Sequence, residues 1–289
     1  FASKSHRDAF TKNPTKFEVQ LGGGCGKMAE LAGRGSTERY WIYKGKLFIF
    51  ASDGCRTGFQ SNPEGHIEKD DPKIQTTPAE SKRGRELLDK AAKWSGIDGL
   101  GKMGSVAFLQ ESVLKQGDQS YDVKGITRLS ASGDYYDVTT YNGAGYANQI
   151  QKGKAIEINS KGVADVHVPT WKRALERQRA RNLAYLLIAR KYKGMTVKFD
   201  GAANGIASVV ANIDGSTSTL WIEESTGKVI SQINKGRNRL GIIGDVQREF
   251  TEYQIKDGVT MPVAWTATFN GQDSPIHDRN PMKLEIRKK

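Results

Sequence analysis

The sequence has no apolar run approaching the roughly 20 residues that a membrane-spanning helix needs. It is also poor in cysteine and histidine, with two cysteines and four histidines among 289 residues. It contains no Walker-type phosphate loop, no His-Glu-x-x-His zinc motif, no Gly-x-Ser-x-Gly nucleophile elbow and no Cys-x-x-Cys pair. These absences leave no basis for catalysis, so we expect a binding or structural protein and not an enzyme.

Positive charge is in excess. The chain carries 44 lysines and arginines against 32 acidic residues, for a net charge of +12. Such a surplus favours anionic partners such as phospholipid head groups, acidic polysaccharides or nucleic acid, but it does not choose among them. A solvated basic surface without a partner explains the charge equally well.

A short segment occurs twice, with a spacing of about fifty residues that is typical of a duplicated small unit. Residues 1–14 and 50–63 share the same residue at half of the aligned positions, and His6 aligns with Cys55. A glycine-rich segment and a strand precede the second copy. The first copy begins at the end of its strand, so we expect its opening segment to be missing from this chain.

The second copy predicts a strand followed by a helix. Residues 46–51 form a short apolar run after a Lys-Gly turn, which favours a strand. Ser52 or Asp53 can then cap a helix that ends before Asn62 and Pro63.

The helix would hold two side chains of interest. Cys55 would lie in its first turn, where the helix dipole favours a thiolate. Phe59 would lie on the same face, four residues on, and pack inward.

The pattern Cys-Gly-x-Met, followed by Lys-Leu-Phe-Ile-Phe-Ala-Ser-x-x-Cys-x-x-x-Phe-x-x-Asn-Pro-Glu, resembles the YHS domain and the related TRASH group of small metal-handling modules. The resemblance implies a site for Cu(I) or Zn(II), because thiolate, thioether and imidazole groups suit these ions. Its candidate ligands are Cys25, Cys55, Met28, His6 and His66. Two other interpretations stay open: the cysteines form a disulfide, or both are small buried side chains.

The rest of the chain predicts a larger β domain. Residues 72–81 are polar and proline-bearing, as in a linker, which separates a module at 1–71 from a domain at 82–289. Two helices are expected, at Ser81–Trp94 and Thr170–Tyr192. The expected antiparallel strands cover 106–116, 119–130, 133–141, 144–152, 154–159, 195–199, 206–213, 218–223, 228–234, 245–256, 260–270 and 282–287.

The helix expected at 170–192 is strongly basic. Its arginines, among them Arg173, Arg177 and Arg181, could face an anionic membrane or RNA. A surface helix that packs one apolar stripe on a sheet is the alternative.

The strand-and-turn pattern of 219–230 and 250–262, with a closing strand after Asn280, resembles the outer-membrane lipoprotein-sorting (LolA-like and LolB-like) superfamily. That resemblance implies a half-open antiparallel barrel that holds acyl chains in an apolar cavity. The expected fold class is therefore α+β: a small duplicated YHS-like module followed by a curled sheet or half-open barrel with two helices.

The sequence thus favours a non-enzymatic bacterial binding protein, exported to the periplasm or the cell surface. It would bind a soft metal ion through the first module and a lipid or other apolar ligand in the barrel; nucleic acid is not the expected partner. The alternative is a structural or assembly subunit of a cell-surface or other large complex.

Overall fold

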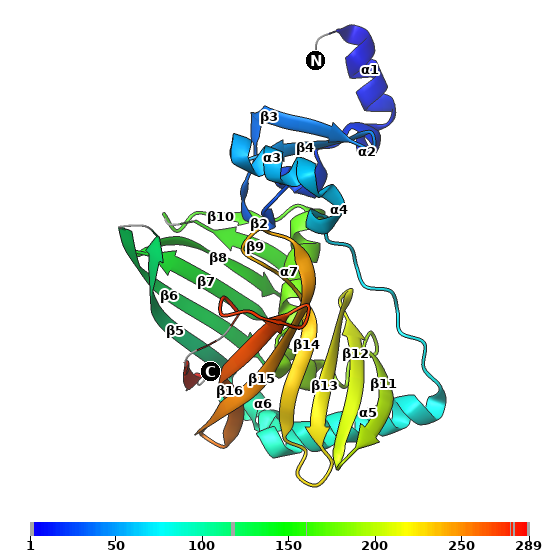
Figure 1. Ribbon diagram of the computed structural model, residues 1–289, viewed down its shortest axis with the longest axis vertical. Helices are drawn as coiled ribbons and strands as arrows, with labels where there is room; N and C mark the ends of the chain where they lie inside the picture. Colours follow the sequence, from blue (N-terminus) through cyan, green and yellow to red (C-terminus); the bar gives the residue numbers. More distant parts are fainter. Residues whose placement is uncertain (1–2, 117–118, 160, 278, 280, 288–289) are drawn as a thin grey trace. The chain divides into compact units, whose positions relative to one another are not determined.

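The computed structural model describes residues 3–116, 119–159, 161–277, 279 and 281–287. The chain divides into two compact units (Figure 1). Unit 1 consists of Phe1–Lys69, Val168–Ala174 and Arg237–Ile243, and unit 2 contains Asp70–His167, Leu175–Gly236 and Gly244–Lys289. The sequence places 168–174 and 237–243 in the second domain, whereas the backbone contacts place both segments in unit 1.

Unit 1 is built on a four-stranded sheet of order β2-β1-β4-β3, in which β1 and β4 run parallel. The other neighbouring strands are antiparallel. The elements from residue 4 to residue 66 are α1 (Lys4–Lys12), α2 (Pro14–Phe17), η1 (Gln20–Gly23), β1 (Gly24–Cys25), β2 (Ala29–Arg34), β3 (Ser36–Tyr43), β4 (Lys46–Phe50), α3 (Asp53–Ser61) and α4 (Pro63–His66).

The strand and helix expected at 46–61 are confirmed. Ser52 caps α3, and its hydroxyl accepts a hydrogen bond from the backbone N–H of Cys55 at 3.1 Å. Cys55 therefore lies in the first turn, and Phe59, four residues on, is fully buried.

The repeated segment keeps its backbone conformation in both copies. Ser3 caps α1 as Ser52 caps α3, by accepting from a backbone N–H three residues on, at 3.2 Å. The residues that end the two helices, Asn13 and Asn62, have φ, ψ of −148°, 72° and −155°, 70°. A proline then starts α2 and α4. The structural repeat thus covers the helix–Asn–Pro–helix segment, but α1, unlike α3, has no buried residue.

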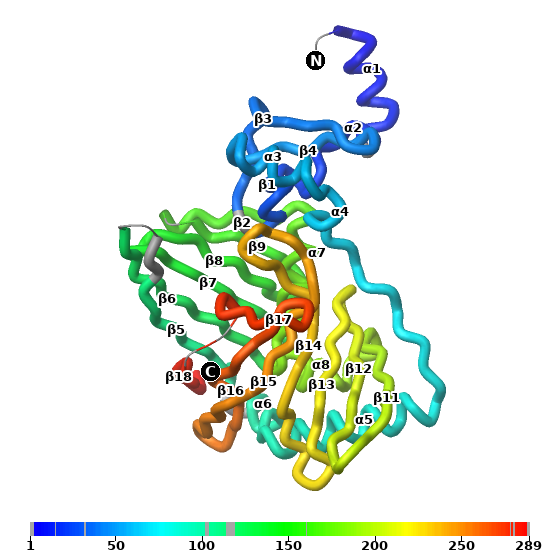
Figure 2. The backbone as a smooth tube through the Cα atoms, in the orientation of Figure 1, coloured from blue at the N-terminus to red at the C-terminus, as the bar shows by residue number. Residues whose placement is uncertain are grey.

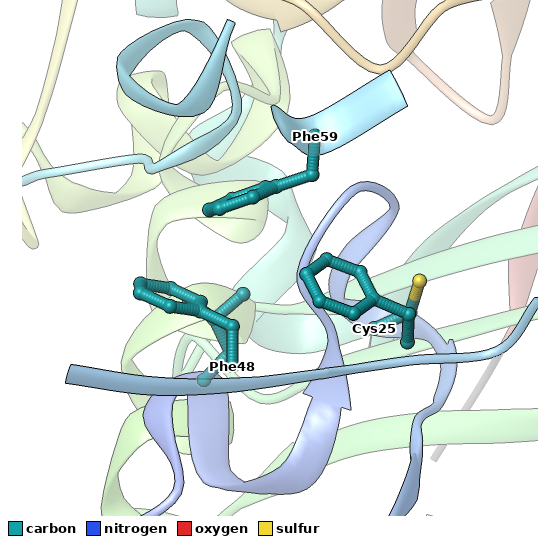
Figure 3. Packing of buried hydrophobic residues seen from close by; sticks show 5 residues of the cluster. Cys25, Phe48 and Phe59 are labelled. Atoms are coloured by element: carbon teal, nitrogen blue, oxygen red, sulfur yellow. The ribbon is translucent and has the colours of Figure 1, made fainter. Parts of the chain in front are cut away.

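The core of unit 1 surrounds Phe59. Its ring lies 4.8 Å from that of Phe48 and 5.3 Å from that of Phe50, measured between ring centroids. Cys25 and Leu21 belong to the same buried cluster (Figure 3). Since the aromatic rings come from β4 and α3, this cluster fixes the helix on the sheet.

The segments 168–174 and 237–243 complete unit 1. The indole N–H of Trp171 donates to the carbonyl of Leu21 at 2.7 Å, and the Arg34 guanidinium lies 5.1 Å from the indole ring. In the other segment, Arg237 donates to the carbonyl of His66 at 3.0 Å. Unit 1 therefore depends on residues that lie far from its N-terminal part in the sequence.

Unit 2 contains two seven-stranded sheets, which remain open within the described part of the chain (Figure 1). The first has the order β10-β9-β8-β7-β6-β5-β18, and the second runs from β11 to β17 in sequence order. The strands are β5 (Ser105–Gln116), β6 (Gln119–Ser130), β7 (Tyr135–Tyr141), β8 (Ala144–Gln151), β9 (Lys154–Ile158), β10 (Ala164–Val166), β11 (Thr196–Ala203), β12 (Ile206–Ile213), β13 (Ser216–Glu223), β14 (Val229–Arg237), β15 (Ile243–Lys256), β16 (Val259–Phe269), β17 (Gln272–Asp273) and β18 (Lys283–Arg287).

All of the strands expected from the sequence are present, within a few residues at their ends, and the α+β class is confirmed. Tight Asn-Gly and Asp-Gly turns set the hairpins: Asn142 and Gly143 have φ of 50° and 80°, and Asp257 and Gly258 have φ of 49° and 77°. The hairpin expected at Gln116-Gly-Asp includes residues outside the described part of the chain.

Four helices and a 3-10 turn accompany the sheets: α5 (Pro78–Ser95), η2 (Ile97–Gly99), α6 (Leu100–Met103), α7 (Pro169–Ala180) and α8 (Leu183–Ala189). Helix α5 begins three residues before its expected start. Thr77, which precedes Pro78, is its N-cap and forms a capping box with Glu80. It packs on β11 so closely that a Cβ at Gly84 would lie 2.7 Å from the side chain of Val197.

The prediction of one helix over 170–192 is wrong, because the helix is interrupted at Arg181 and Asn182 (Figure 2 labels the two parts α7 and α8). Asn182 is extended, with ψ of 126°, and its side chain accepts from the N–H of Ala184 at 2.9 Å. The carbonyl of Arg181 accepts from the amides of Gln232 and Asn234. Asn182 therefore acts as an N-cap that starts a separate, apolar helix.

Candidate binding cavity

Unit 2 contains a half-open cavity of about 420 Å³. Its walls come from the first sheet, from the break between α7 and α8, and from β14 to β16 of the second sheet. Side chains two apart on a strand point to the same face, which is how β6 contributes Gly125 and Thr127, and β7 contributes Asp137 and Thr139. The volume falls within the range of about 300–1,000 Å³ that is typical of small-molecule sites.

One wall of the cavity is apolar and aromatic. Phe250 and Trp265 are directly paired across β15 and β16, and their ring centroids lie 6.1 Å apart in an edge-to-face arrangement. Phe108, Met261 and Met282 also line the cavity. Such side chains offer an apolar ligand dispersion contacts and exclude water from it.

A second wall is polar and internally hydrogen-bonded. Thr127 donates to Asp137 at 2.7 Å, and Gln178 of α7 donates to the same carboxylate at 3.1 Å and to the Tyr135 hydroxyl at 3.3 Å. Burial raises the pKa of Asp137 despite these hydrogen bonds, which act in the opposite direction. This network fixes α7 against the first sheet.

Arginine side chains form the third feature of the cavity. Arg181, Arg248 and Arg279 line it, and Asp137 is the one acidic residue among its described lining residues. The Arg248 guanidinium donates to the side-chain carbonyl of Asn234 at 3.0 Å, and the amide of Asn234 donates to the main-chain carbonyl of Arg181 at 3.3 Å. The cavity thus combines an apolar wall with a cationic region.

The candidate metal ligands are only partly brought together. Cys25 is buried, Cys55 packs against the same cluster, and both are free thiols, so the disulfide interpretation is not supported. Met28 is 42% exposed, and His6 lies on the exposed helix α1.

His66 is used structurally. Its ring stacks on Phe59 with the centroids 5.8 Å apart, and its Nδ1 lies 3.1 Å from the carbonyls of both Lys27 and Gly241. Within the described residues, no group of three or more His, Cys, Asp or Glu side chains is arranged to hold a metal ion. Binding of Cu(I) or Zn(II) stays a prediction.

The interpretation of the basic helix as an anion-binding surface needs correction. Arg177 is 5% exposed and pairs with Asp70 at 2.9 Å, so it does not face solvent. Arg181 is half-buried and lines the cavity, and Arg173 is also half-buried. Their neighbour Arg179 pairs with Asp214 at 2.7 Å. Of the three arginines that the sequence assigned to a membrane surface, Arg177 is buried and the other two are half-buried.

The residues of the cavity itself were not identified from the sequence. Residues such as Arg248 and Trp265 stand in ordinary alternating strands, and nothing local separates them from solvent-facing positions. The break at Asn182 had a usable signal, because an N-cap residue directly precedes the apolar run Leu-Ala-Tyr-Leu-Leu-Ile-Ala.

Comparisons with known proteins give structural similarity at low sequence identity. A DUF1329 family protein from Desulfovibrio piger has a TM-score of 0.44 at 11% identity, covering 73% of this chain and 93% of its own. A domain named for outer membrane lipoprotein sorting, from Vibrio parahaemolyticus, has a TM-score of 0.42 at 11% identity, covering 71% and 93%. A LolA superfamily protein from Nitrosomonas europaea has a TM-score of 0.43 at 9% identity, covering 71% and 94%.

Similarity of this degree does not assign the chain to a family. No protein-family model matches the sequence, and no curated protein matches it significantly. The sequence resemblance to the YHS and TRASH modules therefore has no support among these comparisons. No helix among the described residues is long and apolar enough to cross a membrane.

Proposed function

We propose that this protein is a non-enzymatic carrier that binds an acyl chain in the cavity of unit 2. The observation that carries the proposal is the cavity of about 420 Å³, with its aromatic and methionine-lined wall. The sequence resemblance of the β domain to the lipoprotein-sorting superfamily agrees with this function. The proposal includes export to the periplasm or the cell surface, where such a carrier would meet lipids.

The size of the cavity suits a ligand with a single chain. Its volume of about 420 Å³ lies in the lower part of the range of about 300–1,000 Å³ that is typical of small-molecule sites.

Chain-length dependence tests the proposal. Each buried methylene contributes about 0.8 kcal/mol, so tetradecanol should bind about tenfold more tightly than dodecanol, as measured by displacement of the neutral fluorescent dye N-phenylnaphthylamine. A single affinity for both alcohols, or no binding of either, would contradict an acyl-chain site.

A cavity-filling variant locates the site. Gly125 lines the cavity, and the atoms nearest to a Cβ there, from Gln110 and Val138, would lie 3.6 Å or more away. The Gly125→Leu side chain adds four heavy atoms, in total roughly 120 Å³ at the volume of a water-sized group, and should abolish tetradecanol binding. Ser120→Leu, at an exposed position of the same strand, is the matched control and should bind normally. Equal binding by the two variants would place the ligand elsewhere.

A further inference from the structure

We propose that the cavity recognises the anionic head group, carboxylate or phosphate, of a single-chain lipid through Arg181, Arg248 and Arg279. This inference rests on the acyl-chain site proposed above and specifies its ligand class. The three residues line one cavity together with the apolar wall. An amphiphile with one chain and one negative head matches both features.

Hydrogen bonds and strand pairing hold the three arginines in one region. Asn234 of β14 accepts from the Arg248 guanidinium through its side-chain oxygen and donates to the Arg181 carbonyl through its amide. Arg279 is paired with Trp265 through reciprocal backbone hydrogen bonds of 2.9 and 3.2 Å. All three arginines line the same cavity as Phe250 and Trp265, so an anionic head bound there would lie next to its own chain.

Positive charge predominates among the described residues that line the cavity. Asp137 is the acidic residue among the described lining residues, against three arginines. Burial lowers the pKa of Arg248 to about 10, and the positive charge of Arg279 adds to this effect. Arg248 therefore stays charged at neutral pH, in an environment where an anion would offset the cost of its burial.

Arginine suits both of the head groups considered. Its planar guanidinium forms paired hydrogen bonds with carboxylates and phosphates, which an ammonium group cannot reproduce. A free fatty acid and a monoacyl phospholipid offer this same chemistry, and their relative affinities separate the two sources.

The test compares ligands of one chain length that differ in the head group. Tetradecanoate and monotetradecanoyl glycerol phosphate should displace the dye at concentrations about tenfold or more below those of tetradecanol and methyl tetradecanoate, since hydrogen bonds to charged groups are the stronger class. Whichever of these two charged ligands binds more tightly shows whether the natural ligand is a free fatty acid or a monoacyl phospholipid. Equal affinity for charged and neutral ligands would overturn the head-group inference and leave the acyl-chain site intact.

Variants assign the effect to the arginines. Arg248→Gln and Arg279→Gln should each reduce the preference for tetradecanoate over tetradecanol to less than about threefold. Wild-type hydrogen-exchange protection of the amides of β12 and β16 shows that each variant is folded. Arg248→Lys should keep part of the preference. Arg128→Gln is the matched control, because Arg128 lies on β6, over the Tyr136 ring, and does not line the cavity.

Two outcomes separate the two proposals. If Arg248→Gln and Arg279→Gln keep the full preference for tetradecanoate, the head-group inference is overturned although the ligand binds. If the wild-type protein binds neither the charged nor the neutral ligands, the acyl-chain site itself is refuted, and the head-group inference with it.

Discussion

Gly22 lies close to Trp171, so substitutions at Gly22 test whether residues 168–174 stabilise unit 1. Gly22 has φ of +59°, and a Cβ there would lie 2.6 Å from side-chain atoms of both Trp171 and Val168. Gly23 also has a positive φ, +86°, but a Cβ there would meet nothing within 4 Å. The two neighbours therefore share a backbone constraint and differ in their contacts.

The expected effects follow from this difference. Gly23→Ala should cost about 1–2 kcal/mol, the price of placing an L-residue in the left-handed region. Gly22→Ala should cost that amount plus about 1–3 kcal/mol for the displaced neighbours, and it should weaken the hydrogen bond from Trp171 to Leu21. Gly22→Ala should therefore destabilise unit 1 by about 2–5 kcal/mol in total.

Hydrogen exchange measures these effects unit by unit. The amides of β1 and β4, together with the Gly26 N–H that donates to the Ile49 carbonyl at 2.9 Å, report on unit 1. The amides of β12 report on unit 2. A double-mutant cycle with Trp171→Phe should show strong non-additivity with Gly22→Ala and none with Gly23→Ala. Equal losses of protection in the two alanine variants would refute the role assigned to residues 168–174.

Three further predictions concern caps and protonation. Ser52→Ala should lower the stability of unit 1 by about 1 kcal/mol, because α3 carries the buried Phe59, whereas Ser3→Ala should only fray α1, as hydrogen exchange of each helix would show. Asn182→Ala, which removes the cap on α8, should cost unit 2 about 1 kcal/mol in urea unfolding, and Asn182→Asp should restore most of it. Burial lowers the pKa of His66, whereas a histidine in the unfolded chain titrates near pH 6.5. Unit 1 should therefore keep its full stability above about pH 6.5 and lose it as the pH falls towards the lowered pKa of His66; His66→Gln should flatten this profile.

Local sequence patterns predicted the individual elements well. The strand at 46–50 and the helix at 53–61 follow from a Lys-Gly turn, an apolar run and the Ser52 cap, all within a few residues of one another. The hairpins of unit 2 follow from Asn-Gly and Asp-Gly turns between alternating strands. The helix at 170–192 was predicted as continuous because its apolar stripe continues through Asn182, and the capping role of Asn182 was not recognised.

The candidate site residues were predicted less accurately than the secondary structure, for a physical reason. A ligand set such as Cys25, Cys55 and His66 requires side chains from several elements to converge, and the fold instead uses His66 to hold backbone carbonyls together. Likewise, Arg177 looks like a surface residue on a basic helix, yet it is buried against Asp70, more than a hundred residues earlier in the chain. Pairings at such separations leave no local signal.

By itself, the sequence determined the α+β class, the positions of most strands, the repeated capped-helix segment and the surplus of positive charge, because turn chemistry, capping and alternation act over a few residues. The tertiary structure alone decided that residues 168–174 and 237–243 complete unit 1 and that Arg181, Arg248 and Arg279 meet an aromatic wall. Both outcomes depend on which distant segments lie side by side, and that is set by packing of the whole chain.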